Sequence, residues 1–280
     1  MKLHAKMLLL GAALAALPAF GQAVPQIPFD SVPDAIKLPK DMYLGEASGV
    51  AVNSKGHIFV FSRGNTRGPA YAAAAAQLLE FDENGFFVRE IGKNLYGWSF
   101  AHAVRIDRAD NIWVTDKGSD LVIKFTPEGK VAMVIGRKQE ASDEDTGPVK
   151  HPNPPAPAED GRFRQVTDIT WDHLGNTYIS DGYINSRVAK VDKNGKWLMS
   201  FGEPGAGPGQ FNTPHSIAAD AYPGRIYKMT LDGKVLGTIG GPGRALKQFG
   251  WVHEIACPNE NTLYVAELLN WRVQKLLLHP

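Results

Sequence analysis

The chain alternates apolar and polar residues over short segments, and one arrangement of segments recurs along it. Each unit starts with a short apolar strand, passes through a turn rich in Asp, Asn and Gly into an aromatic-containing strand, and ends with two more strands joined by a second turn. Period-two alternation predicts β-strands, and Asn-Gly and Asp-Gly turns favour antiparallel hairpins. Four short antiparallel strands in about 40–50 residues are typical of a β-propeller blade.

Five such units begin along the chain, at residues 48–92, 101–136, 166–202, 211–240 and 252–276. The last unit stops after its third strand, so we expect residues 36–44 to supply its outer strand and close the edge. The fourth unit is truncated. It starts with FNTPHSIAAD and passes to RIYKMTLDGKVLGTIG without the strand that matches NIWVTD and NTYISD in the second and third units. The sequence therefore predicts an all-β propeller of five blade units, one of them incomplete.

The N-terminal segment and the composition indicate the cellular location of this domain and the partners to expect. Residues 1–23 combine Lys2 and Lys6 with an apolar run and small residues near Ala23, as in a signal peptide. An uncleaved membrane anchor is the alternative. We expect a single propeller domain over residues 24–280, in the periplasm or secreted. The net charge of +1 gives no basic face for nucleic acid. Cys257 is the single cysteine, so no internal disulfide forms.

Three of the eight histidines occupy the same place in their units. His102, His215 and His253 each stand where the innermost strand begins, and that strand lines the central channel of a propeller. The first and third units carry Gly49 and Asp168 there. Three imidazoles that converge from different blades predict a zinc site with an open fourth position. Polar residues that only hold ordered water are the alternative.

Two further residues follow the second strands of their units. Arg63 follows the second strand of the first unit, and Tyr183 follows that of the third. A tyrosine above a metal can act as a general base when the metal and a nearby arginine favour its phenolate, and an arginine can bind a carboxylate with paired hydrogen bonds. An ordinary turn aromatic and an ordinary surface cation are the competing interpretations.

The strings FSRGN, AHAVRID, SDGYINSR, GQFNTPHSIA and VHEIA resemble the peptidyl-α-hydroxyglycine α-amidating lyase family, which is built on NHL-type repeats. The resemblance covers roughly residues 48–276 apart from one gap. It implies a six-bladed propeller that cleaves peptidyl-α-hydroxyglycine, a carbinolamide, to a peptide amide and glyoxylate. It also implies a zinc ion held by the three histidines, with Tyr183 as base and Arg63 as active-site arginine.

The resemblance implies a structural calcium ion as well. Its ligands would be the backbone carbonyls of Val50 and Val104 and the carboxylate of Glu254, and oxygen ligands suit this hard cation. The partner would be a small peptide or carbinolamide, bound by a monomer that contacts neither nucleic acid nor, after signal cleavage, a membrane.

The truncation falls where the family carries a second active-site arginine, and Arg225 at the junction does not take that role. It also brings the units of His215 and His253 next to each other, so that either a five-unit ring distorts the zinc site or the ring stays open. We expect the deletion to weaken or abolish lyase activity. A non-catalytic NHL propeller that binds peptide, protein or glycan is the alternative function. A hydrolase or lactonase of the same architecture is a third, although such sites favour carboxylate and Asn ligands around calcium.

Overall fold

The computed structural model describes residues 24–64, 76–138, 157–205, 210–211, 213–215, 219–220, 224–229 and 235–279. Throughout these ranges the regular structure is β-strand, and the main sheets are antiparallel, which confirms the predicted all-β class. In these ranges no helix is long and apolar enough to cross a membrane. The predicted signal peptide and most of the long loop expected at residues 139–160 lie outside the described residues.

Three of the sheets have four consecutive strands each, in chain order. The first contains β2 (Ala47–Val52), β3 (Ile58–Ser62), β4 (Gln77–Phe81) and β5 (Phe87–Ile91). The second contains β6 (Ala101–Ile106), β7 (Ile112–Asp116), β8 (Leu121–Phe125) and β9 (Val131–Gly136). The third contains β10 (Asp168–Trp171), β11 (Thr177–Asp181), β12 (Arg187–Val191) and β13 (Trp197–Phe201).

The last sheet joins the two ends of the chain. It contains β19 (Val252–Asn259), β20 (Thr262–Glu267) and β21 (Arg272–Leu278), and its outer strand is β1 (Phe29–Val32). Strand β1 pairs antiparallel with β21. An N-terminal strand was expected here, but its predicted position at residues 36–44 is wrong. The apolar residues of that segment, including Ile36 and Leu38, pack against the core of the first sheet instead.

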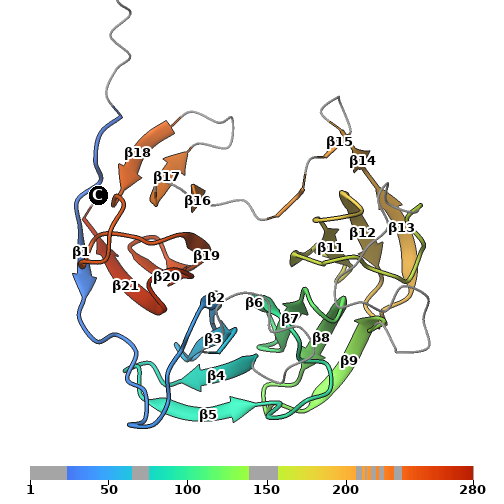
Figure 1. Ribbon diagram of the computed structural model, residues 1–280, viewed down its shortest axis with the longest axis horizontal. Helices are drawn as coiled ribbons and strands as arrows, with labels where there is room; N and C mark the ends of the chain where they lie inside the picture. The colour runs from blue at the N-terminus through green and yellow to red at the C-terminus, as the bar shows by residue number, and fades with distance from the viewer. Residues whose placement is uncertain are drawn as a thin grey trace, which may run out of the picture.

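The fourth unit is shorter than the others, as the sequence predicts. It forms a three-stranded sheet of β16 (Ala219–Asp220), β17 (Arg225–Met229) and β18 (Val235–Ile239). Before it, β14 (Glu203–Pro204) pairs in parallel with β15 (Gln210–Phe211). Figure 1 shows the sheets arranged about a common centre in an open arc, with β10–β13 at one end and β16–β18 at the other. Of the two predicted arrangements, the structure therefore describes the open one.

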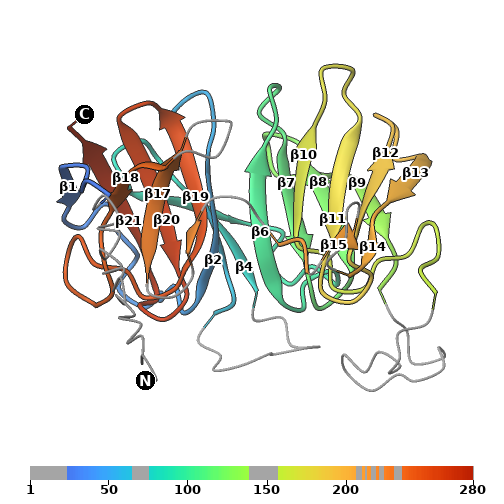
Figure 2. The ribbon, with the colours of Figure 1, turned by 90° about the horizontal axis from the view of Figure 1, so that it is seen from above.

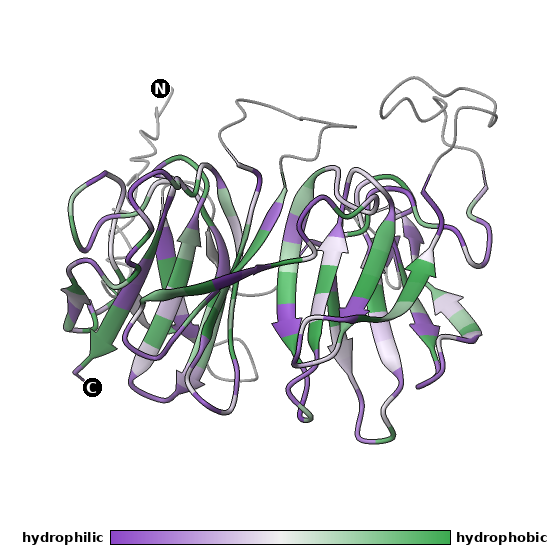
Figure 3. Cartoon of the chain, turned by 90° about the horizontal axis from the view of Figure 1, so that it is seen from below, coloured by the Kyte–Doolittle hydropathy of each residue, from purple (hydrophilic) through white to green (hydrophobic). Residues whose placement is uncertain are grey.

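Apolar packing between neighbouring sheets holds the arc together. The strands of the different sheets run roughly parallel to one another through the thickness of the molecule (Figure 2). Hydrophobic residues, green in Figure 3, are interspersed with polar ones along the strands. Between the first and second sheets, the ring of Trp98 lies 5.1 Å from that of Phe61 and 5.9 Å from that of Phe125. Trp113 and Trp171 meet in the same way between the second and third sheets. Burial of these large rings supplies much of the stabilisation.

A buried carboxylate at the end of the second strand organises several blades. Asp116 ends β7 and accepts hydrogen bonds from the backbone amides of Ser99 and Phe100, both at 2.9 Å. Asp181 and Glu267 end β11 and β20 in the same manner and accept hydrogen bonds from their own loops. Asp116 thus fixes the approach to β6, the strand that carries His102.

Phe29 tests the closing strand β1. Its side chain is buried in a cluster with Phe249 and Leu276, so Phe29→Ala should lower the free energy of unfolding by about 3 kcal/mol. Phe86→Ala is the matched control, because Phe86 is 54% exposed and should change stability little. Denaturant titration measures both. Equal stability of the two variants would contradict the assignment of β1 to the core.

Candidate metal centre

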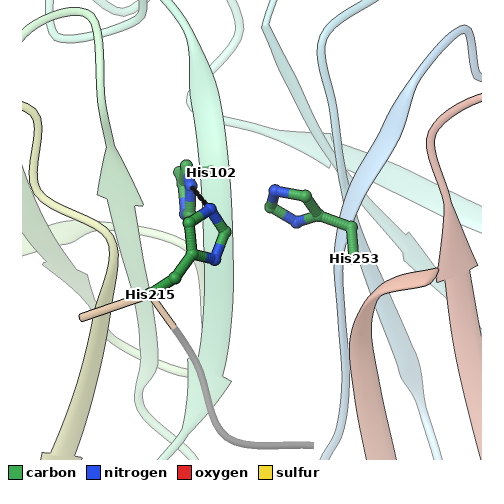
Figure 4. Close-up of side chains that lie close together, drawn as sticks. All are labelled: His102, His215 and His253. Atoms are coloured by element: carbon green, nitrogen blue, oxygen red, sulfur yellow. Dashed lines mark hydrogen bonds between the residues drawn. The ribbon is translucent and has the colours of Figure 1, made fainter. Parts of the chain in front are cut away.

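The structure brings the three predicted histidines together in the channel. The Nε2 atoms of His102 and His215 are 3.1 Å apart, and one nitrogen from each of the three rings lies within 4.8 Å of the others. The ring of His253 is centred 4.7 Å from His102 and 5.2 Å from His215. In Figure 4, His253 points at the other two rings from the opposite side of the channel.

Backbone carbonyls of neighbouring sheets orient two of the rings. His102 Nδ1 lies 2.7 Å from the carbonyl oxygen of Thr167, and His253 Nδ1 lies 2.6 Å from that of Ser48. A carbonyl oxygen only accepts, so Nδ1 carries the proton and donates it in both pairs. In a neutral imidazole this leaves a lone pair on Nε2, the atom available to a metal.

His215 keeps its place although its own blade is incomplete. The Thr167 hydroxyl lies 2.9 Å from the carbonyl oxygen of Pro214, the residue before His215. Gly182 allows the same carbonyl to approach closely, because a Cβ at that position would come within 2.1 Å of it. The phenol of Tyr183 completes the support, with its oxygen 2.8 Å from His215 Nε2. The third sheet therefore holds His215 without help from the truncated unit.

Electrostatics keep the three imidazoles neutral. Burial lowers the pKa of His102 and of His253 well below the usual value, and the neighbouring histidines and Arg63 lower both further. Burial, with Lys117 next, also lowers the pKa of His215. Each of these influences disfavours the imidazolium. Three neutral imidazoles with converging nitrogens fit the donor set that zinc prefers.

The other two predicted site residues flank the histidines. Arg63 Nε donates to the carbonyl oxygen of Ala101 at 2.9 Å, directly before His102, and Arg63 Nη1 pairs with Glu46 at 3.0 Å. Tyr183 lies over the centre, with its oxygen 3.5 Å from His102 Nε2. Burial raises the pKa of the Tyr183 phenol, while Arg63 acts in the opposite direction.

Two residues at this centre, Thr167 and Lys117, were not predicted from the sequence. The Lys117 ammonium lies 3.8 Å from the centroid of the Tyr183 ring. Burial and the nearby Arg63 lower the pKa of Lys117 to about 8. The pair Lys117-Gly118 follows the second strand of its unit as Arg63-Gly64 follows that of the first, and that repeat position could have pointed to it. Thr167 had no such signal, because its role depends on contacts between blades.

A second group of charged residues, here called the lower group, borders the same cavity as the histidines. Its members are Arg105, Asp168 and Glu254. Arg105 donates to both carboxylate oxygens of Asp168, at 2.9 and 2.6 Å, and its Nη1 lies 3.0 Å from Glu254 Oε1. Burial raises the pKa of Glu254, and Arg105 opposes that rise. One guanidinium thus pairs with both carboxylates.

This second group does not fit the calcium site that the resemblance implies. The backbone amides of Val50 and Val104 both donate to Glu254 Oε2 at 3.2 Å, so this carboxylate oxygen already has two hydrogen-bond donors. Calcium needs several oxygen ligands, and amide hydrogens are not ligands. With Arg105 already beside the carboxylate, a divalent cation would also face a fixed positive charge.

The sheets arranged about a channel define a β-propeller. Streptogramin B lyase shares this fold, with a TM-score of 0.53 at 12% identity over 90% of this chain and 98% of that one. No family model matches the chain.

Relatives by sequence are more specific. The chain is 30% identical over 226 residues to peptidyl-glycine alpha-amidating monooxygenase of Mus musculus, which covers 72% of the chain and 21% of that protein. It is 27% identical over 192 residues to a probable peptidyl-alpha-hydroxyglycine alpha-amidating lyase of Caenorhabditis elegans, over 62% of the chain and 50% of that protein. It is 28% identical over 203 residues to NHL repeat-containing protein 3 of Mus musculus, over 67% and 50%.

The chain thus spans between about a fifth and a half of the length of these curated relatives. By sequence it is related to the peptidylglycine amidating monooxygenases, the peptidyl-α-hydroxyglycine α-amidating lyases and an NHL repeat-containing protein.

Stability measurements should show that calcium is not needed. We expect millimolar calcium to leave the melting temperature unchanged, whereas an ion at 100 times its Kd would add about 2.7 kcal/mol. Arg105→Met should cost about 3–5 kcal/mol, because it leaves Asp168 and Glu254 buried without their cation. Arg108→Met, at an exposed position of the adjoining turn, is the control. A calcium-dependent rise in the melting temperature of the unmodified protein would contradict this interpretation.

Proposed function

We propose that this protein is a zinc-dependent lyase that cleaves peptidyl-α-hydroxyglycine, or a related carbinolamide, to an amide and glyoxylate. The convergence of three neutral imidazoles beneath the Tyr183 phenol is the observation that carries the proposal. The names of two groups of relatives, the amidating monooxygenases and the amidating lyases, support the same chemistry.

His102, His215 and His253 would hold the zinc ion through their Nε2 atoms. When bound, the ion would act as a Lewis acid that lowers the pKa of the substrate hydroxyl. The carbonyls of Thr167 and Ser48 orient two of the rings for this purpose, and contacts of that kind strengthen metal binding. With His215 Nε2 serving as a ligand, the Tyr183 hydroxyl would no longer hydrogen-bond to that nitrogen and would be available to the substrate.

Tyr183 would accept the proton of the substrate hydroxyl. The O–H electron pair then forms the carbonyl of glyoxylate, the C–N bond breaks, and the amide nitrogen takes up a proton. Arg63 opposes the rise in the Tyr183 pKa and so favours the phenolate that this step needs. It also adds positive charge beside the negative charge that develops. No electron acceptor is required.

We expect the truncation to lower the rate of the lyase reaction more than it weakens binding of the metal ion. The stretch in which the family carries its second arginine is missing, so lower lyase activity remains our expectation. The open arc nevertheless leaves the three imidazoles close together, since His215 is held by the third sheet. Export of the protein remains the prediction that residues 1–23 support.

A non-catalytic propeller that binds a peptide, protein or glycan is the second candidate. The likeness to NHL repeat-containing protein 3 favours it, since that name specifies a repeat and no reaction. Metal content after gentle purification separates the two candidates, because a pure binding module has no use for three converging neutral imidazoles.

Release of glyoxylate from a hydroxyglycine peptide tests the function directly. We expect stoichiometric zinc and measurable glyoxylate for the unmodified protein. His102→Ala should lose most of the zinc and at least about 100-fold in rate, because it removes a ligand. His173→Ala, at an exposed position, should match the unmodified protein in both. Full zinc occupancy in His102→Ala would exclude the proposed ligand set.

Tyr183→Phe separates proton transfer from metal binding. The substitution keeps the ring and removes the hydroxyl, so zinc content should be unchanged while kcat falls by about 100-fold or more. Metal analysis and steady-state kinetics on the same sample measure the two effects. If kcat were unchanged with zinc in place, another group would have to be the base.

A further inference from the structure

Lys117 occupies a position that repeats from blade to blade. Its backbone amide donates to the carbonyl oxygen of Phe100 at 2.9 Å, directly before the strand that carries His102. The amide of Arg63 makes the same contact with Glu46, and the amide of Leu268 makes it with Trp251. The three residues are therefore structurally equivalent. In the first two blades this position carries a cation, Arg63 in the first and Lys117 in the second.

The Lys117 ammonium is half-buried among aromatic rings and near a second cation. It lies 3.8 Å from the centroid of the Tyr183 ring and 5.3 Å from that of Phe100. The Arg63 guanidinium lies 4.0 Å from the same Phe100 ring. Cation–π contacts hold both groups in place, but they do not neutralise either charge.

In the described part of the chain, Lys117 has no carboxylate within ion-pair distance. Three other lysines that also stack on aromatic rings differ: Lys124, Lys190 and Lys247 each pair with an aspartate. Two cations gathered around one ring, in a partly desolvated site, repel each other, and an anion placed between them relieves that repulsion. Arg63 already gives its Nε and Nη1 donors to Ala101 and Glu46, which leaves Lys117 as the better direct partner for such an anion.

We propose that Lys117 binds the carboxylate of the substrate's hydroxyglycine end, with Arg63 reinforcing the positive potential beside it. This inference rests on the proposed function and specifies its substrate class. The site selects molecules with a free terminal carboxylate next to the carbinol carbon over their amides and esters.

Equilibrium binding of an unreactive analogue tests the subsite separately from catalysis. The probe is an N-acylglycine, which has the carboxylate but no hydroxyl, and its C-terminal amide is the uncharged counterpart. Calorimetry on zinc-loaded protein should show the acid bound at least about tenfold more tightly than the amide, as expected for one charge-assisted contact. Lys117→Met should reduce that preference to less than about threefold, and Lys117→Arg should retain most of it.

Lys37→Met is the matched control, because Lys37 also stacks on an aromatic ring, that of Phe86, but is exposed. It should leave the preference unchanged. A preference that persists in Lys117→Met, at equal zinc content and equal melting temperature, would overturn the subsite, and so would the absence of any preference in the unmodified protein.

Glyoxylate release from the hydroxyglycine peptide, measured in parallel, keeps the two claims apart. An unmodified protein that binds the acid through Lys117 but releases no glyoxylate retains the subsite and loses the proposed function. Normal glyoxylate release with an unchanged KM in Lys117→Met would retain the proposed function and overturn the subsite. We expect KM to rise at least about tenfold in Lys117→Met, with kcat changed far less.

Discussion

Thr167 is the point on which the geometry of the centre depends. Its carbonyl oxygen accepts hydrogen bonds from His102 Nδ1 and from the Thr115 hydroxyl, and its own hydroxyl reaches the carbonyl of Pro214. One fully buried residue of the third sheet thus orients a histidine of the second sheet and positions the segment of His215. A propeller that is open at one side can therefore still bring three imidazoles together. The contacts that position the rings of His102 and His215 join neighbouring blade units on the side of the arc that is closed.

Positively charged side chains lie in two groups near the histidines. In the lower group, the Arg105 guanidinium pairs with both Asp168 and Glu254, so a permanent organic cation stands beside the carboxylate that would otherwise suit a metal ion. In the upper group, burial keeps the imidazoles neutral, which is the form in which they bind metal. Arg63 and Lys117 then stand beside that centre, around the rings of Phe100 and Tyr183, where a substrate anion would complete the charge balance.

The repeat pattern of the sequence was enough to predict the blades, the short fourth unit and the three histidines, since each follows from position within a repeat. It placed the closing strand wrongly, because residues 36–44 look apolar enough for a strand but pack as a loop on the first sheet, and pairing with β21 selects residues 29–32. Thr167 and Arg105 could not be predicted, because their partners lie in other blades. Lys117 could have been, had its equivalence to Arg63 been considered.

The central claim is that His215, although cut off from a complete blade, joins His102 and His253 around one metal ion. The zinc K-edge X-ray absorption spectrum of the loaded protein measures this most directly. We predict three imidazole nitrogens at about 2.0–2.1 Å, together with one oxygen ligand at the open position, and the loss of one imidazole in His215→Ala. Two imidazoles in the unmodified protein, or a spectrum that His215→Ala leaves unchanged, would contradict the account.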